Sequence, residues 1–182
     1  MEYIKTEIEG VLIIQPRVFE DARGYFFEAW KKAEFEEHVG KVEFIQDNES
    51  KSSFGVLRGL HYQRGEFSQA KLVRVISGRV LDVAVDLRKD SPTVGRYVMA
   101  ELSAENKRQF FIPRGFAHGF LVMSDEAIFT YKVDNPYAPQ CDAGIRWNDP
   151  DLGIEWPIDP AKVLTSEKDL KQPLLKDAEV FE

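Results

Sequence analysis

The sequence predicts a mainly β jelly roll with a few short peripheral helices. Apolar and polar residues alternate with a period of two over 81–87 and 127–133, which is typical of strands with one buried face. Other short apolar runs follow at close spacing, separated by turn residues such as Gly55 and Ser77-Gly78. So many short strands favour a sandwich or barrel.

The expected strands share a short apolar run bounded by turn residues, and in chain order they cover residues 11–14, 42–47, 56–62, 71–76, 81–87, 96–102, 108–112, 118–123 and 127–133. One helix is expected over 31–39, because Phe35 and Val39 stand four residues apart and Gly40 follows as a stop. Near the C-terminus, Ser166 followed by Asp169 resembles a capping box that opens one or two helical turns.

Length and composition indicate one globular domain over residues 1–182. A chain of 182 residues with 43% hydrophobic residues is large enough for a core of its own. Cys141 is the single cysteine, which excludes an intrachain disulfide and indicates a cytoplasmic protein. The net charge of −7 disfavours nucleic-acid binding, and no apolar run approaches the ~18 residues of a membrane span.

The three histidines differ in their surroundings. His38 lies in the charged helix and is expected to be a solvated surface residue. His61 stands in the strand segment RGLHYQ with Arg58, but by parity the two side chains point to opposite faces. A bulge or a curved wall is needed for both to reach one ligand, and the alternative is a hydrogen-bonded core histidine.

His118 ends a P-x-G-x-x-H pattern that begins at Pro113. This pattern resembles the second motif of the cupin superfamily of small jelly rolls. Metal-binding cupins have an H-x-H pair in their first motif, where this chain has His61 and Gln63. Two histidines cannot form a three-histidine site, so no metal is expected.

Seven runs closely resemble the dTDP-4-dehydrorhamnose 3,5-epimerase family, in that family's order and spacing, from about residue 3 to about residue 175. They are FEDARGYFFE, FIQDNESKS, LRGLHYQ, KLVRV, AENKRQFFIPRGFAHGF, TYKVDNPY and IRWNDPDLGIEWP. The resemblance implies a cupin-like jelly roll, a homodimer whose N-terminal strand crosses to the partner, no metal or other cofactor, and a dTDP-4-keto-6-deoxyhexose substrate.

The resemblance also implies a role for individual residues. His61 matches the general base, Asp169 the carboxylate that pairs with it, and Tyr131 the general acid. Lys71, Arg58 and His118 match residues near the keto sugar. Further matches to substrate-binding residues are Arg23 and Glu28, which come from the partner subunit, the run Gln46, Asp47 and Asn48, the thymine-stacking Tyr137, and Asp142 and Lys168.

Two matches depart from the pattern or depend on the alignment. Asp142 stands where the family more often has Glu, and the SEKD run of Lys168 and Asp169 follows a loop of variable length. Each residue also has a structural interpretation: Asp169 as a helix-capping residue, Tyr131 as a half-buried strand aromatic, and Lys71 and Arg58 as solvated charges.

These residue types suit epimerisation next to a ketone. Removal of a proton there creates an enolate, whose oxygen a lysine ammonium such as Lys71 can stabilise. Imidazole is a suitable base at neutral pH, a carboxylate fixes its tautomer, and a phenol can return a proton to the opposite face. The ketone itself is the electron sink, so no cofactor is required.

The sequence leaves three competing functions open. A single-centre epimerase at C3 or C5, or a 3,4-ketoisomerase, would differ in pocket details that one sequence does not show. A sugar-nucleotide-binding jelly roll without turnover has no need of both an acid and a base. A metal-dependent cupin conflicts with the histidine count.

Overall fold

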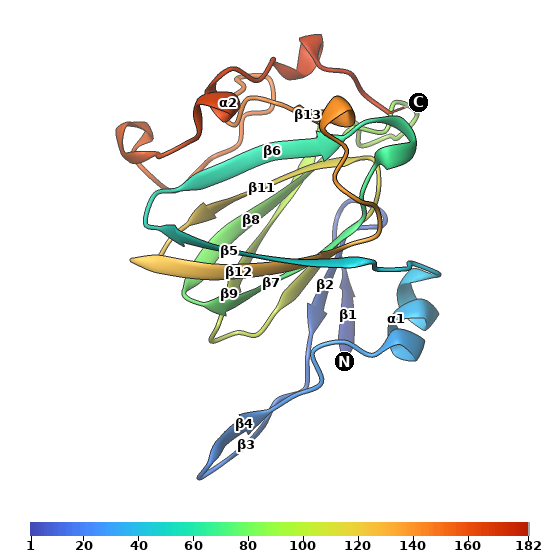
Figure 1. Cartoon of the computed structure of the whole chain (residues 1–182), viewed down its shortest axis with the longest axis vertical. Coiled ribbons are helices and arrows are strands. Elements are labelled where there is room, and N and C mark those ends of the chain that lie inside the picture. Colours follow the sequence, from blue (N-terminus) through green and yellow to red (C-terminus); the bar gives the residue numbers. More distant parts are fainter. Residues whose placement is uncertain (182) are drawn as a thin grey trace.

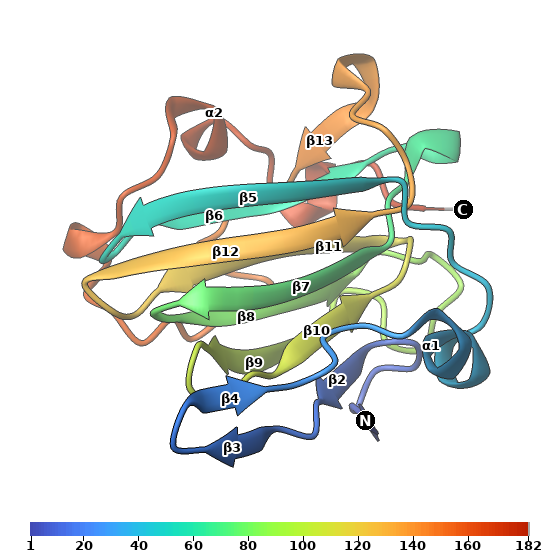
Figure 2. The same ribbon diagram turned by 60° about the horizontal axis from the view of Figure 1, so that its bottom comes forward.

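The computed structural model, which describes residues 1–181, consists mainly of two antiparallel sheets that face each other (Figures 1 and 2). The six-stranded sheet has the order β1 (Glu2–Lys5), β2 (Leu12–Gln15), β10 (Gln109–Ile112), β7 (Lys71–Ser77), β12 (Glu126–Val133) and β5 (Gln46–Ser53). The five-stranded sheet has the order β13 (Asp142–Gly144), β6 (Leu57–Gln63), β11 (Phe116–Val122), β8 (Arg79–Asp86) and β9 (Tyr97–Ser103). The predicted mainly β jelly roll is confirmed.

Helices are short and peripheral, as expected. The two α-helices are α1 (Lys32–Val39) and α2 (Glu167–Leu170), and four 3₁₀ turns cover Gly65–Phe67, Pro139–Cys141, Pro160–Lys162 and Leu175–Asp177. The α1 helix buries Phe35 and ends at Gly40, where φ is +98°, as the sequence predicted. No described helix is long and apolar enough to cross a membrane.

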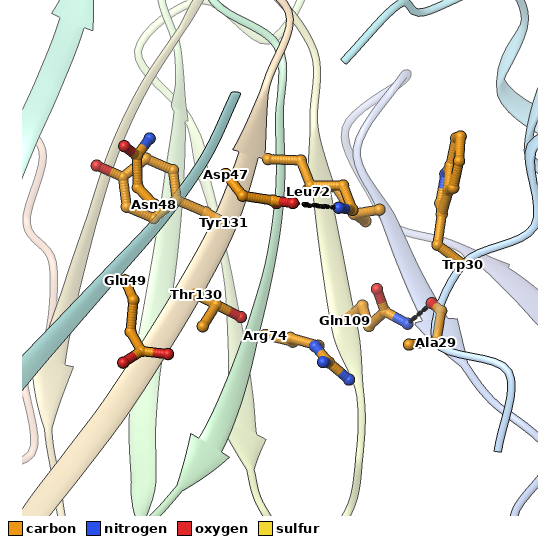
Figure 3. A pocket seen from close by; sticks show the side chains of 11 residues that line it. Ala29, Trp30, Asp47, Asn48, Glu49, Leu72, Arg74, Gln109, Thr130 and Tyr131 are labelled. Carbon is orange, nitrogen blue, oxygen red and sulfur yellow. Dashed lines mark hydrogen bonds and ion pairs between the residues drawn. The ribbon is translucent and has the colours of Figure 1, made fainter. Parts of the chain in front are cut away.

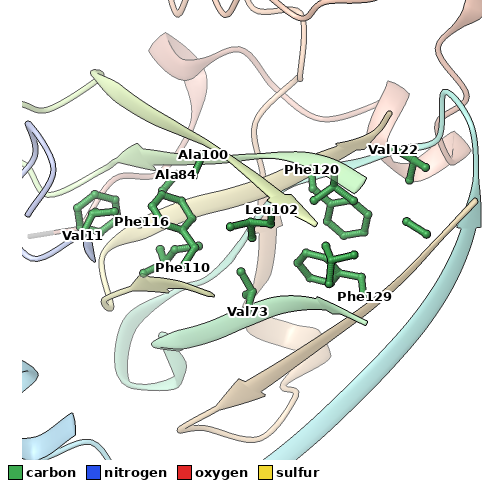
Figure 4. Close-up of a cluster of buried hydrophobic side chains, with 14 of the residues drawn as sticks. Val11, Val73, Ala84, Ala100, Leu102, Phe110, Phe116, Phe120, Val122 and Phe129 are labelled. Atoms are coloured by element: carbon green, nitrogen blue, oxygen red, sulfur yellow. The ribbon is translucent and has the colours of Figure 1, made fainter. Parts of the chain in front are cut away.

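The main core lies between the two sheets (Figure 4). Its members alternate along the strands, so that Phe129 of β12 stacks on Phe120 of β11 with ring centroids 4.1 Å apart. Val73, Leu102 and Phe110 are fully buried in the same layer. This core occupies most of the inter-sheet space and leaves the polar residues described below at one end.

The expectation that 81–87 has only one buried face was wrong. Val83 and Val85 are buried on the outer face of the sheet, where the C-terminal segment brings Leu175 and Phe181 against them. The inner face carries the fully buried Asp82. A covering segment more than 80 residues downstream is a tertiary feature, which local alternation does not encode.

The strand expected at 42–47 is displaced. The β5 strand runs over Gln46–Ser53, whose sequence QDNESKSS is almost entirely polar, because β5 lies at the sheet edge. Val42 and Phe44 instead pack with Phe35 of α1 outside the six-stranded sheet. Edge strands need little apolar sequence, and for the same reason β1 and β13 were missed.

A two-stranded hairpin was also missed. It consists of β3 (Phe19–Asp21) and β4 (Gly24–Phe26), and it extends away from the two sheets (Figure 1). All of its residues are exposed, including Phe19, Tyr25 and Phe26. The hairpin therefore carries exposed apolar surface on a projecting element.

Candidate active site

A histidine–carboxylate pair joins β6, the second strand of the five-stranded sheet, to α2. The Nε2 atom of His61 on β6 lies 2.5 Å from Oδ1 of Asp169 on α2. The Asp169 residue is buried, at 3% exposed, and its Oδ2 also accepts a bond from the Gly59 amide at 3.5 Å. Burial acts to raise the pKa of Asp169, but the hydrogen bond and charge of His61, together with hydrogen bonds from Gly59 and Ser166, lower it overall. An ionised Asp169 therefore accepts the Nε2 proton and leaves Nδ1 of His61 free to act as a base.

Asp169 makes a contact of each kind that the sequence left as alternatives. Its backbone N–H donates to Oγ of Ser166 at 3.1 Å, which caps α2. Its carboxylate meanwhile turns towards His61. The capping box thus fixes the first turn of α2 at the point from which the carboxylate reaches β6.

A bulge in β6 brings Arg58 and His61 to the same face. Opposite β11, His61 pairs with His118 and Arg58 pairs with Phe120, so two residues of β6 face one of β11. Gly59 lies in this bulge with φ of +139°, and a Cβ there would stand 2.6 Å from the Gly119 Cα atom. The sequence required either a bulge or a curved wall here, and the structure has the bulge.

A second histidine–carboxylate pair lies deeper between the sheets. His118 Nε2 is 2.9 Å from Oδ1 of Asp82, and both residues are buried. Burial lowers the pKa of His118 and raises that of Asp82. Sequence reasoning missed Asp82 as a site residue, although a single acid inside the apolar run VLDVAV was a usable signal.

Lys71 begins β7 beside this buried pair. Burial lowers the pKa of Lys71 to about 8, although Asp82 and Asp142 act to raise it. The Lys71 ammonium makes no hydrogen bond or ion pair with another residue in the part of the chain that the structure describes. A desolvated ammonium without a hydrogen-bonding partner is suited to a developing oxyanion.

Tyr131 lies across the inter-sheet space on β12, partly buried against the main core. Burial raises the pKa of its hydroxyl and nearby Arg58 opposes this, so the phenol stays protonated at neutral pH. Asn48 of β5 is its neighbour in the strand register. Arg58 itself donates from Nε to Ser52 Oγ at 3.1 Å, a second contact that sequence reasoning did not anticipate.

Three of the predicted nucleotide-binding residues form one network. The Tyr137 hydroxyl donates to Oδ2 of Asp142 at 2.9 Å, and Nζ of Lys168 forms an ion pair with the same oxygen. Tyr137 is 60% exposed, so its ring is available for stacking. The SEKD run is therefore placed beside both Asp142 and His61, as the resemblance implied.

The structure does not bring every predicted binding residue to this place. Arg23 pairs with Asp21 on the projecting hairpin, and Glu28 is exposed just after it. Gln46 is exposed and donates to Asn48 at 2.8 Å. Asp47 forms an ion pair with Lys132, the residue opposite it on β12, and lines a pocket of about 480 Å³ that Tyr131 also lines (Figure 3). Asp47 and Asn48 line this pocket together, so two adjacent residues of the QDN run border one cavity.

The pocket at His61 and Asp169 has a volume of about 320 Å³ and is also lined by Arg58 and Lys168. A larger pocket of about 1030 Å³ lies beside α1 and is lined by none of the predicted catalytic residues.

Gln63 stands where metal-binding cupins have a histidine ligand. Its side-chain amide instead forms hydrogen bonds with the backbone of Phe67, Pro136 and Ala138. Within residues 1–181, no three His, Cys, Asp or Glu residues are grouped so that they could hold a metal ion.

Known proteins are similar to this chain in both sequence and fold. The family model for dTDP-4-dehydrorhamnose 3,5-epimerase matches residues 5–177. A dTDP-4-dehydrorhamnose 3,5-epimerase of Shigella flexneri is 56% identical, and the match covers 100% of this chain and 99% of the relative.

Two solved structures are informative about ligands. An epimerase structure from Legionella pneumophila in complex with dTDP-4-keto-L-rhamnose has a TM-score of 0.94 and 47% identity, covering 98% of this chain and 94% of that one. A 3′-monoepimerase from Streptomyces bikiniensis in complex with dTDP-quinovose has a TM-score of 0.89 and 34% identity, covering 95% and 87%. A family model that spans nearly the whole chain, together with relatives above half identity, places this protein in the dTDP-4-dehydrorhamnose 3,5-epimerase family.

Proposed function

We propose that this protein epimerises C3 and C5 of dTDP-4-dehydro-6-deoxy-D-glucose, with His61 as the base and Tyr131 as the acid. The observation that carries the assignment is the 2.5 Å contact between His61 Nε2 and the buried Asp169 carboxylate. That contact leaves Nδ1 as the only basic atom of the imidazole. A base of this kind, across the inter-sheet space from a protonated phenol, suits proton removal on one face and return on the other.

Each inversion consists of two proton transfers. His61 takes the proton from the carbon next to the C4 ketone, the C–H electron pair becomes the enolate, and its negative charge lies on the C4 oxygen. Lys71 stabilises that oxygen. The Tyr131 hydroxyl then gives its proton to the opposite face of the same carbon, the ketone forms again, and the tyrosinate recovers its proton from water or from the imidazolium.

Two kinds of relative bear on whether one or two carbons are inverted. The Legionella protein was solved with dTDP-4-keto-L-rhamnose, and the Streptomyces protein is named a 3′-monoepimerase. At 56% identity the Shigella 3,5-epimerase is much more similar to this chain than the monoepimerase at 34%. Double epimerisation is therefore the better-supported reaction, and a single-centre reaction is the second candidate.

The deciding experiment is incubation with the dTDP-4-keto sugar in deuterated water. We expect NMR to show solvent deuterium at both C3 and C5. Exchange at one carbon would support a single-centre epimerase, and no exchange by the wild-type protein would leave only a sugar-nucleotide-binding jelly roll. The matched control is His61→Asn, which should abolish exchange at both carbons while dTDP binding, measured by calorimetry, stays nearly unchanged.

We further propose a cytoplasmic homodimer in which residues 1–182 of each subunit form one domain. Arg23 lies between β3 and β4, on the hairpin that extends away from the two sheets, and Glu28 is exposed just after it, which supports a role for both in the nucleotide site of another molecule (Figure 1). The exposed Phe19 and Phe26 provide apolar surface with which the hairpin can pack against the partner subunit. A reducing compartment fits a chain whose single cysteine is unpaired.

A further inference from the structure

A series of polar contacts joins the exposed ring of Tyr137 to the helix that carries Asp169. The Tyr137 hydroxyl and the Lys168 ammonium both bind Oδ2 of Asp142. The Asp142 side chain is only 12% exposed, whereas that of Lys168 is 53% exposed. Lys168 directly precedes Asp169 in α2. The ion pair therefore lies one residue away from the carboxylate that binds His61.

The α2 helix needs contacts outside itself. It has only four residues, and a helix of one turn is not stable by its own hydrogen bonds. Leu170 is 56% exposed, so apolar packing anchors it weakly. Apart from its Ser166 cap and a 3.3 Å bond from Arg146 to the Leu170 carbonyl, the polar contacts that join α2 to the sheets within residues 1–181 are made by the side chains of Asp169 and Lys168.

The two contacts reach the same pair of strands. Asp142 opens β13, and in the register of β13 with β6 the third residue, Gly144, stands opposite His61. The Lys168–Asp142 ion pair therefore fixes α2 to the strand next to the base. A small shift of α2 would change the 2.5 Å contact between Asp169 and His61, and shifts of about 1 Å in a catalytic array can cost ~100-fold in rate.

We propose that Lys168 is a positioning residue that, through Asp142, holds α2 so that Asp169 stays bonded to His61. The Tyr137 hydroxyl completes this tether, so a base stacked on the Tyr137 ring steadies the histidine–carboxylate pair. The inference rests on the proposed function of His61 and Asp169. It gives Lys168 a role in turnover that differs from the substrate contact implied by family resemblance.

The test is a comparison of kcat, KM and the dissociation constant of dTDP in lysine variants. We expect Lys168→Met to lower kcat by about 10- to 100-fold, with KM and the dTDP constant within about threefold of wild type. Lys168→Arg keeps the cation and should recover most of kcat. The control is Lys171→Met, directly after α2. Among the described residues Lys171 pairs only with Glu167, at 3.9 Å, so this variant should leave kcat unchanged.

The double variant Lys168→Met/Asp142→Asn separates positioning from direct contact. If the two residues act as one tether, its kcat should equal that of the single variants, because the second change removes nothing further. Losses that multiply, or a tenfold rise in KM with kcat unchanged, would overturn the proposal in favour of substrate contact. Should Lys168→Met fail to fold, Asp142→Asn alone must show the same fall in kcat.

The same assay distinguishes this proposal from the one on which it rests. Wild-type protein that exchanges no substrate deuterium refutes the epimerase function itself. Wild-type protein that exchanges normally, beside a Lys168→Met protein with normal kcat, refutes only the tether. Tyr137→Phe keeps the ring and loses the hydroxyl, so we expect a smaller fall in kcat with dTDP affinity retained.

Discussion

At the scale of single residues, we expect Lys71 to determine how the reaction rate falls at alkaline pH. Burial lowers its pKa to about 8, so its stabilising charge is present below that pH and is lost as the pH rises through it. We expect kcat/KM to fall tenfold for each pH unit above pH ~8, as loss of a single proton requires. In Lys71→Arg the cation persists at high pH, so this alkaline limb should disappear even if the maximal rate is lower. An unchanged limb in Lys71→Arg would assign it to another group.

Tyr131 and His61 can be separated by isotope exchange. In Tyr131→Phe the base can still form the enolate, whereas the proton donor on the opposite face is lost. We expect deuterium to enter the substrate with retained configuration faster than the epimerised product forms. The measurement compares deuterium content with stereochemistry at matched times. Equal losses of exchange and inversion would show that Tyr131 acts in enolate formation or substrate placement.

At the scale of elements, the β6 bulge determines whether Arg58 and His61 share a face. Gly59 has φ of +139° and touches the β11 backbone, so Gly59→Ala meets both strain and a clash. We expect a loss of about 1–3 kcal/mol in the free energy of unfolding, measured by urea denaturation, with a larger loss of activity. Gly65→Ala is the control: its φ is +58°, but a Cβ there meets no atom within 4 Å. It should cost about 1 kcal/mol and leave activity intact. Equal effects of the two variants would contradict this role of the bulge.

At the scale of the whole molecule, an active site that uses residues of both subunits predicts that two inactive variants can complement each other. If Arg23 serves the partner's site, a mixed dimer of Arg23→Ala and His61→Asn contains one intact site and one doubly defective site. After re-equilibration of a 1:1 mixture, half of the dimers are mixed, so about a quarter of the wild-type activity should return. Each variant alone should stay nearly inactive. A mixture that gains nothing over its components would place Arg23 in its own subunit's site.

The sequence by itself determined the strand-rich class, helix α1 with its Gly40 stop and the Ser166 cap. These features depend on residues close together in the chain, where periodicity and capping act directly. The family resemblance added which distant residues belong to one site. Only the tertiary structure decided that Asp82 faces inward under His118, that polar β5 is an edge strand, and that a bulge at Gly59 aligns Arg58 with His61. Burial, strand register and a covering C-terminal segment are set by contacts far apart in sequence, so the faces of β5, β6 and β8 could not be assigned from local alternation.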